Sequence, residues 1–477
     1  MDAILFYTSL SLLFIFLILK HLTKKRYNLP PSPTPALPIL GHLHLLKPPL
    51  HRTLRRFSQK HGPIFSLKLG ECFTTNDIVF SNRPRTLANE HIGYNHSTMA
   101  GVSYGHQWRS LRRLGAQEVF SPVRLNAFSQ IREEEMRRTL RTLITSGNEY
   151  TKVELRPKLF ELIFNVIMRL LAGKKYPENK ELGEKFREMV TEVLAHAQSS
   201  NPEDFLPFLQ WIDYRGLKKK FSDLGKKLDD FYQNMLEEHR REKRNTIIGH
   251  LLSLQESDPE FYTDQTIKGF VTIRNIIVGG TDTSVVTLEW AMSILLNHPD
   301  ALQKAKLELD SQIGHHRLVE EQDLPRLHYL RNIIFETFRM FPAGPLLLPH
   351  ESSADCKVGG YDIPSRTMLL VNVWAIQRDP EVWEDPICFK PERFEGKEAE
   401  AQKLMPFGMG GRVCPGSSLA HRMVGLALAS LIQCFEWKRI GLEEVDLIEG
   451  DALTMPKLKP LEAMYRPRGL MLKVLQD

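Results

Sequence analysis

One short stretch of this sequence places a cysteine where it can act as a metal ligand. The stretch is Phe407-Gly-Met-Gly-Gly-Arg-Val-Cys-Pro-Gly416, and an apolar segment, residues 417–435, follows it directly. Its glycines allow a loop to turn sharply and to approach a flat partner where a Cβ atom would collide. The apolar segment predicts a helix, and unpaired N–H groups and the helix dipole at its start favour a thiolate that stays ionised when buried. Cys414 is therefore the first candidate for chemistry.

A second candidate is Gly279-Gly-Thr-Asp-Thr-Ser284, within a stretch, residues 263–296, whose periodicity predicts one long helix. Two adjacent glycines inside a helix cost about 1–2 kcal/mol relative to alanine, which calls for a reason. Gly279 and Thr283 lie one turn apart on the same face, so the glycine can open a groove. The Thr283 hydroxyl can then bond a carbonyl oxygen of the preceding turn. A packing notch between helices is the alternative explanation.

Three weaker patterns surround these two. Trp108-Arg-Ser-Leu-Arg112 places an indole and a guanidinium one turn apart, and Glu336-Thr-Phe-Arg339 places opposite charges on one helix face. Pro391-Glu-Arg-Phe394 follows before the cysteine segment. Each of these patterns occurs in ordinary amphipathic helices, so their order along the chain carries the argument.

In that order, the patterns resemble the haem-thiolate enzymes of the cytochrome P450 superfamily. The resemblance implies a mainly α fold with small β-sheets (α+β), in which a single large helical domain holds haem b between the groove helix and the helix after the cysteine loop. It implies Cys414 as the axial iron ligand, and a thiolate in that place favours O–O cleavage. The resemblance implies further haem contacts at Trp108, Arg112, His350, Arg412, Phe407 and Gly408.

The same resemblance assigns roles to the charged residues. Asp282 and Thr283 match the acid and the threonine that deliver protons in the oxygen groove, so they are the candidate catalytic residues. Glu336, Arg339 and Arg393 match a buried, ion-paired cluster under the cysteine loop, in which one carboxylate takes two guanidinium groups. These three residues support the site and are not expected to be catalytic.

The activity implied is that of a monooxygenase, which inserts one atom of O2 into a small hydrophobic substrate with electrons that an NADPH-dependent reductase delivers. Asn82-Arg-Pro-Arg85 and Thr454-Met-Pro-Lys457 resemble the plant isoflavone-hydroxylase-type branch, which implies a phenolic or flavonoid-type metabolite. We expect the acidic reductase to dock on Arg109 and Arg113; solvated helix charges are the alternative. Two other functions stay open: a reductase-independent haem-thiolate isomerase or dehydratase acting on a peroxide, which could dispense with the acid–threonine pair, and a non-catalytic haem protein.

The N-terminus differs in character from the rest. Residues 3–19 are apolar and uncharged, and a basic cluster, residues 20–26, follows. Such a segment can just cross a membrane core of about 30 Å, and the charges indicate a cytosolic C-terminal side. The sequence thus predicts a transmembrane anchor at 1–21, a basic and proline-rich linker at 22–41 and a catalytic domain at 42–477, held at the endoplasmic reticulum membrane. A cleaved signal peptide is the alternative.

Composition excludes other classes. The chain has 477 residues, a formal net charge of +6 and scattered cysteines without C-x-x-C spacing. This argues against a disulfide framework and a zinc site, and no cluster of basic residues indicates nucleic-acid binding. The cysteines are Cys72, Cys356, Cys388, Cys414 and Cys434.

Periodicity also predicts secondary structure and two departures from the family pattern. We expect helices over 159–171 and 224–238, and strands at 63–69, 346–349, 368–373 and 471–474. A hairpin strand and a short helix are expected near residue 70 but are missing from the sequence, which supports the non-catalytic alternative. Arg274 interrupts an apolar helix and must pair with a carboxylate or face a cavity, because a buried unpaired charge is not tolerated.

Overall fold

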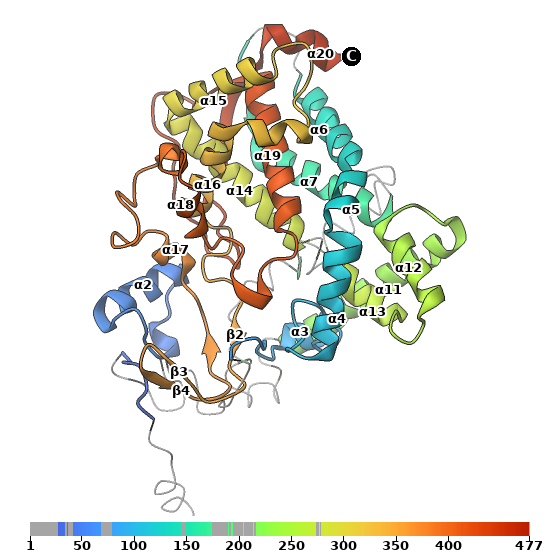
Figure 1. Cartoon of the computed structure of the whole chain (residues 1–477), viewed down its shortest axis with the longest axis vertical. Helices are drawn as coiled ribbons and strands as arrows, with labels where there is room; N and C mark the ends of the chain where they lie inside the picture. The colour runs from blue at the N-terminus through green and yellow to red at the C-terminus, as the bar shows by residue number, and fades with distance from the viewer. Residues whose placement is uncertain are drawn as a thin grey trace, which may run out of the picture.

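The chain folds mainly into helices, with three small antiparallel sheets in the part that the structure describes (Figure 1). This computed structural model describes residues 27–33, 36, 42–67, 79–144, 149–173, 189, 192–193, 204, 213, 216–272, 276 and 278–476. The mainly α fold with small sheets that the sequence predicts is confirmed.

The described α-helices are α2 (Leu50–His61), α3 (Leu87–His91), α4 (His106–Leu114), α5 (Pro122–Ala127), α6 (Ser129–Leu143), α7 (Leu155–Ala172), α11 (Leu217–Glu242), α12 (Ile247–Ser257), α13 (Asp264–Val271), α14 (Val278–Asn297), α15 (Pro299–Gln312), α16 (His328–Met340), α17 (Val373–Ile376), α18 (Glu398–Gln402), α19 (Ser417–Cys434) and α20 (Leu472–Gln476).

The described strands form three separate sheets. One sheet has the order β1-β7-β6, and two others pair β2 with β5 and β3 with β4. The strands are β1 (Thr151–Glu154), β2 (His350–Glu351), β3 (Cys356–Val358), β4 (Tyr361–Ile363), β5 (Met368–Leu369), β6 (Phe435–Lys438) and β7 (Glu462–Pro467).

Three helices, α7, α14 and α19, make the centre of the molecule. Helix α14 packs against both α7 and α19 (Figure 1). Most side chains of α7 and α19 are buried, and Trp290 of α14 is completely buried. A helix that is apolar on all sides belongs in a core, so the composition of these segments explains their central place. Gly173, in the left-handed conformation with a φ of 67°, ends α7.

The prediction of one continuous helix over 263–296 is wrong, because the helix is interrupted at Thr272. Helix α13 ends at Val271, and Thr272 has extended backbone angles (φ −49°, ψ 151°). Val271 and Thr272 are β-branched, which weakens helix propensity at this point. Gly279 and Gly280 lie in α14, after this break.

Helices were predictable where the periodic pattern is long, and strands were not. The segments 159–171 and 224–238 lie inside α7 and α11. Of the predicted strands, only 368–369 forms one; residues 63–67 and 346–349 have no strand structure, and 471–474 are helical. Strands of two to six residues are too short to show clear alternation.

The described part of the linker is attached to the catalytic domain. The backbone N–H of Asn28 donates to Asp362 Oδ2 at 2.9 Å, and the Asp362 N–H donates to the Asn28 carbonyl oxygen at 2.9 Å. Ser66 donates from its backbone N–H to the carbonyl oxygen of Pro31 at 2.8 Å. The chain therefore enters the domain beside the β3–β4 hairpin.

Some predictions concern segments outside the described ranges. Arg274 and the expected hairpin position at 68–78 are among them. None of the described helices combines the length and apolar character that crossing a bilayer requires, and the predicted anchor at 1–21 also lies outside the described residues.

Candidate functional site

The cysteine loop is closed by its own backbone. The Cys414 N–H donates to the Phe407 carbonyl oxygen at 2.9 Å, so the two ends of the loop meet. Gly408 and Gly410 have φ angles of 73° and 69°, in the region that favours glycine. These glycines are thus required by the turn itself, and the loop delivers Cys414 to the start of α19, as the sequence predicts.

The Cys414 thiol is a free cysteine with three favourable neighbours. Burial raises its pKa, while the backbone N–H of Gly416, the Arg112 guanidinium and the backbone N–H of Ser417 act in the opposite direction. The two N–H groups lie at the start of α19, where the sequence predicts donors that favour a thiolate, and burial acts against it. A metal cation against the sulfur deprotonates a coordinating thiol outright, so this donor set fits an axial ligand to iron.

Trp108 on α4 is packed between two side chains beside the loop. The Arg412 guanidinium lies 4.6 Å from the centre of its ring, and the Tyr104 ring lies tilted by 39° at a centroid distance of 5.2 Å. Arg412 donates to the carbonyl oxygens of Ser81 at 2.6 Å and of Val102 at 2.7 Å. Arg412 therefore ties the cysteine loop to the segment before α4.

Arg112 lies one turn after Trp108 and is half-buried. Burial lowers the pKa of Arg112, and the nearby Cys414 sulfur raises it. Among the described residues, no carboxylate lies within ion-pair distance of Arg112, so its guanidinium can serve an anionic group of a cofactor. A cation that is partly desolvated beside the thiol fits a haem propionate.

His350 contacts a segment that is distant in the sequence. Its Nδ1 lies 2.5 Å from the carbonyl oxygen of Phe80, and the residue begins β2, which pairs with β5. The predicted haem contacts thus come from α4, the cysteine loop and β2, and the structure links Trp108 and Arg412 directly and Arg112 to Cys414 electrostatically.

The groove residues of α14 lie in the part of the helix that is less buried than the rest. Gly279 is exposed, whereas Val285 and the residues after it are buried. The Thr283 hydroxyl donates to the Gly279 carbonyl oxygen at 2.6 Å, which confirms the predicted bond to the preceding turn. Asp282 accepts a hydrogen bond of 2.6 Å from the Thr454 hydroxyl, a partner that the sequence did not predict.

The predicted ion-paired cluster is confirmed. Glu336 accepts from Arg339 Nε at 2.7 Å and from Arg393 Nε at 3.2 Å, and the backbone N–H of Lys390 donates to it at 2.9 Å. Glu336 and Arg339 are completely buried. Arg339 also donates to the carbonyl oxygens of Gln377 and Pro386, so the cluster joins α16 to the segments before the cysteine loop.

An aromatic cluster that the sequence analysis missed connects α16 to the cysteine loop. The ring of His421 on α19 lies 5.0 Å from that of Phe407 and 5.5 Å from that of Phe338. His421 Nδ1 lies 2.8 Å from the Ser417 carbonyl oxygen, and burial lowers its pKa. Lone histidines and phenylalanines have no readable pattern, so only the fold could reveal them.

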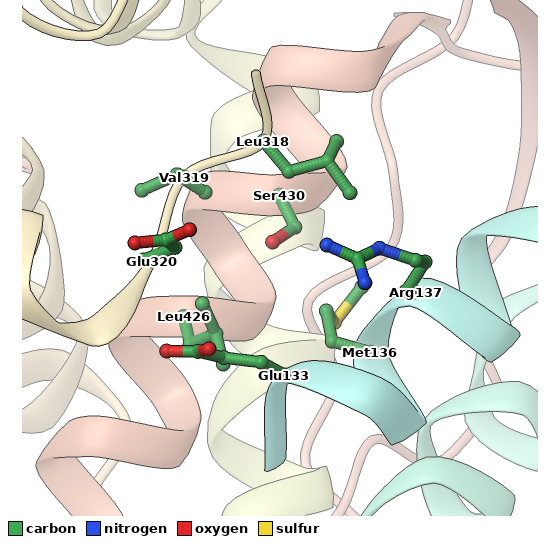
Figure 2. A pocket seen from close by; sticks show the side chains of 8 residues that line it. All are labelled: Glu133, Met136, Arg137, Leu318, Val319, Glu320, Leu426 and Ser430. Atoms are coloured by element: carbon green, nitrogen blue, oxygen red, sulfur yellow. The ribbon is translucent and has the colours of Figure 1, made fainter. Parts of the chain in front are cut away.

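Two hollows on the described surface lie elsewhere. One, between α6 and α19, has a volume of about 10 Å³, with Glu133 and Glu320 on one side and Arg137 on the other (Figure 2). It holds at most one water molecule. A wider cleft of about 680 Å³ lies between α19 and the helical turn Glu321–Arg326. Neither is lined by Cys414 or Asp282, so neither is the place where a substrate meets the cysteine loop.

Comparison with known proteins agrees with this geometry. Residues 30–462 match the family model described as Cytochrome P450. A zebrafish cytochrome P450 solved with abiraterone superposes with a TM-score of 0.75 over 89% of this chain and 100% of its own, at 23% identity. That likeness concerns the fold.

Curated plant proteins are similar over nearly the whole chain. Cytochrome P450 81Q32 of Catharanthus roseus is 53% identical over 99% of both chains. The (+)-piperitol/(+)-sesamin synthase CYP81Q2 of Sesamum radiatum is 49% identical over 100% of this chain and 99% of its own. Isoflavone 2'-hydroxylase of Glycyrrhiza echinata is 47% identical over 98% and 97%. The first two alignments span 494 and 504 residues, longer than this chain of 477, so these relatives contain residues that it lacks.

Proposed function

The chain belongs to the cytochrome P450 family and is a monooxygenase, and on this premise we propose that it oxidises a small hydrophobic phenolic metabolite of the flavonoid or lignan type. The observation that carries the chemistry is the Cys414 thiol, with Arg112 and two backbone N–H groups directed at it. The substrate class rests on the relatives, which are named as an isoflavone hydroxylase and a sesamin synthase.

We assign haem b to the space beside the cysteine loop, where it supplies activation of O2 when bound. Cys414 holds the iron through its sulfur, and Arg112 balances a propionate. Arg412 donates to backbone carbonyl oxygens, so its contribution is to orient Trp108 and to hold the loop against α4. His350, Phe407 and Gly408 complete the set that surrounds the cofactor.

Asp282 and Thr283 are assigned to proton delivery. Burial raises the pKa of Asp282, with the Thr454 hydrogen bond and the charge of Arg156 acting against it. A carboxyl with a raised pKa holds its proton closer to neutral pH, which suits a proton donor. Thr283, next to it, has a hydroxyl that can both donate and accept, so it can pass a proton onward.

Electrons come from NADPH through a flavin reductase that docks near the cysteine loop. Arg109 and Arg113 are exposed on α4, whose buried side holds Trp108. Two exposed apolar side chains join them in this proposal: Met409 of the loop, 65% exposed, and Val123 at the start of α5, 78% exposed. Basic charge around an apolar contact is suited to an acidic partner.

Residues 1–21 are assigned to a membrane anchor, 22–41 to the linker and 42–477 to the catalytic domain, which faces the cytosol at the endoplasmic reticulum. The attachment of Asn28 to Asp362 supports an orientation in which the β3–β4 hairpin is near the membrane. The basic residues after the anchor support the cytosolic side.

The first test is the carbon-monoxide difference spectrum of the full chain. Wild type and Cys434→Ser are expected to show the thiolate signature, and Cys414→Ser is expected to lose it. Retention of the signature in Cys414→Ser would refute the ligand assignment. Cys434 is a suitable control because it is a buried cysteine at the other end of the same helix.

The second test is turnover with a plant reductase, NADPH and two substrate panels, isoflavones and furofuran lignans. Oxygenated product that depends on NADPH and reductase supports the proposal, and the panel that reacts identifies the class. Product formed from a hydroperoxide without reductase would instead support an isomerase or dehydratase. A thiolate spectrum without turnover in either panel would contradict the proposed substrate class.

A further inference from the structure

The carboxylate of Asp282 is held by a residue far away in the sequence. The Thr454 hydroxyl donates to Asp282 Oδ2 at 2.6 Å across a separation of 172 residues, in a part-buried position. Thr283, the neighbour of Asp282, bonds within its own helix. Among the described residues, the other carboxylate oxygen of Asp282 has no hydrogen-bond partner. The acid therefore has one fixed oxygen and one oxygen open to a proton.

The loop that holds Thr454 is fixed at the next residue, Met455, through both its carbonyl oxygen and its N–H. The indole N–H of Trp290, two turns after Asp282 on α14, donates to the Met455 carbonyl oxygen at 2.7 Å. The Met455 N–H donates to the Ala343 carbonyl oxygen at 2.9 Å. The loop is thus attached to the same helix that carries the acid, and the Thr454 hydroxyl is held in place before any substrate binds.

We propose that Thr454 is a positioning residue for Asp282: its hydroxyl fixes one carboxylate oxygen on the C-terminal loop and so leaves the other oriented for proton transfer to Thr283. This proposal rests on the proposed role of Asp282 in proton delivery. It adds a third residue to that pair, supplied by a segment that the acid–threonine motif does not include. The proton enters and leaves through Asp282, and Thr454 keeps its own hydroxyl proton.

The groups around Asp282 determine the direction in which its pKa changes when the Thr454 hydroxyl is removed. Burial raises its pKa, and the Thr454 hydrogen bond followed by the charge of Arg156 lowers it. Arg156 itself is paired with the fully buried Glu289 at 2.5 Å, and Lys457 lies in the same loop region, with Glu289 among the charges that act on it. Removing the Thr454 hydroxyl therefore takes away a donor that favours the ionised acid, and the pKa of Asp282 is expected to rise further.

The decisive experiment compares Thr454→Val, which removes the hydroxyl and keeps the branched shape, with Thr454→Ser, which restores a hydroxyl. Thr287→Val is the matched control, because the Thr287 hydroxyl donates to the Thr283 carbonyl oxygen of the same helix and not to Asp282. The first readout is a pH titration of the protonated-carboxyl infrared band in the full-length holoenzyme, assigned to Asp282 by its loss in Asp282→Asn.

In Thr454→Val the band is expected to titrate at higher pH than in wild type, in Thr454→Ser close to wild type, and in Thr287→Val unchanged. The second readout is the peroxide released per NADPH with reductase present. Peroxide release is expected to rise by about tenfold in Thr454→Val, because a factor of this size corresponds to the free energy of one hydrogen bond to a charged group. In Thr454→Ser, peroxide release is expected to return to the wild-type level.

An unshifted titration in Thr454→Val overturns the positioning role, whatever the turnover shows. A shifted titration with unchanged peroxide release overturns the proposed proton-delivery role of Asp282 and leaves the Thr454 contact in place. The two failures are thereby distinguished. A shift of the same size in Thr287→Val would also overturn the proposal, because the effect would then belong to the helix as a whole.

Discussion

Two carboxylates of the molecule, the buried Glu336 and the part-buried Asp282, are held in opposite ways. Glu336 is completely buried and accepts from two guanidinium groups and a backbone N–H, so its charge is matched. Within the described part of the chain, Asp282 accepts from one hydroxyl, and burial raises its pKa. A carboxylate surrounded by donors is a fixed part of the framework, whereas one with a single neutral donor can exchange a proton. The number of donors therefore separates the supporting role from the chemical one.

This difference explains why the two carboxylates lie in different settings. Glu336 connects α16 to Lys390 and Arg393, in the segment that precedes the cysteine loop along the chain. Asp282 lies on α14, about one turn after exposed Gly279, and contacts a loop from the C-terminal part of the chain. Rigidity is needed at the first place and adjustable charge at the second.

The largest effect is expected from neutralising the matched carboxylate. Glu336→Gln leaves the charges of Arg339 and Arg393 without their counter-charge, which is expected to cost about 3–5 kcal/mol of folding free energy. Chemical denaturation of the full chain measures this cost, and the yield of thiolate spectrum is expected to fall with it.

Glu392→Gln is the control for that substitution. Glu392 pairs with Lys304 at 2.7 Å at the surface, in the same short helix as Arg393, Pro391–Phe394. Exposed pairs of this kind contribute about 0–1 kcal/mol, so this variant is expected to remain near wild type. Equal losses in both variants would show that the donor count at Glu336 has no special weight.

Another carboxylate, the buried Glu449, extends the comparison to acid pH. Burial alone would raise its pKa, but hydrogen bonds from His51 and Arg52 outweigh burial and bring the pKa to about 2. Trp374 also donates to it, at 2.7 Å. Because the folded-state pKa lies below the usual value of 4.5, its contribution to stability is present above about pH 4.5 and is lost as the pH falls towards 2.

The loss is expected to reach about 3 kcal/mol at pH 2, from a shift of somewhat more than two units at about 1.4 kcal/mol each. Unfolding free energies of wild type and Glu449→Gln, measured from pH 7 to pH 2, test this. The difference between the two proteins is expected to shrink below pH 4.5. A difference that stays constant across that range would contradict a depressed pKa.

The sequence predicted the site where chemistry requires fixed residue types, and failed where contacts depend on the fold. Cys414, the glycines of its loop and the Glu336 cluster follow from short patterns in a set order, and the structure places them as predicted. Thr454 lies 172 residues from Asp282, and His421 has no motif around it, so neither contact could be inferred. A contact between distant segments has no local signal.

The fold shows the same division. Helices α7 and α11 were predicted because they are long and periodic. The break at Thr272 was missed because its β-branched neighbours are also apolar and continue the pattern. The sheet β1-β7-β6 was missed because its strands are short and come from three distant segments.

A smaller effect is expected from removing the hydroxyl of Thr283, the residue next to Asp282. Thr283→Ala is expected to retain the thiolate spectrum and to lower product formed per NADPH by about tenfold to a hundredfold, with peroxide released in its place. Ser284→Ala is the matched control, because its hydroxyl makes the same kind of bond, to the Gly280 carbonyl oxygen at 2.8 Å, on the buried side of the helix. Full coupling in Thr283→Ala would remove this residue from proton delivery and weaken the contrast with Glu336.

The smallest effect is expected at the exposed cations, where water screens charge that the interior does not. Arg109 lies over the ring of Tyr104 at 5.6 Å, and it and Arg113 point away from the core of α4. Charge reversal, Arg109→Glu or Arg113→Glu, is expected to slow reduction by the reductase by about two- to fivefold each, because exposed pairs contribute about 0.2–1 kcal/mol. Stopped-flow reduction measures this rate.

Raising the ionic strength shortens the screening length below about 8–10 Å and is expected to slow reduction of the wild type while reducing the difference in rate between the wild type and the variants. Lys219→Glu, an exposed charge on α11, is expected to have no effect. If reduction is independent of salt, or if Lys219→Glu slows it equally, the α4 cations are not part of the docking surface.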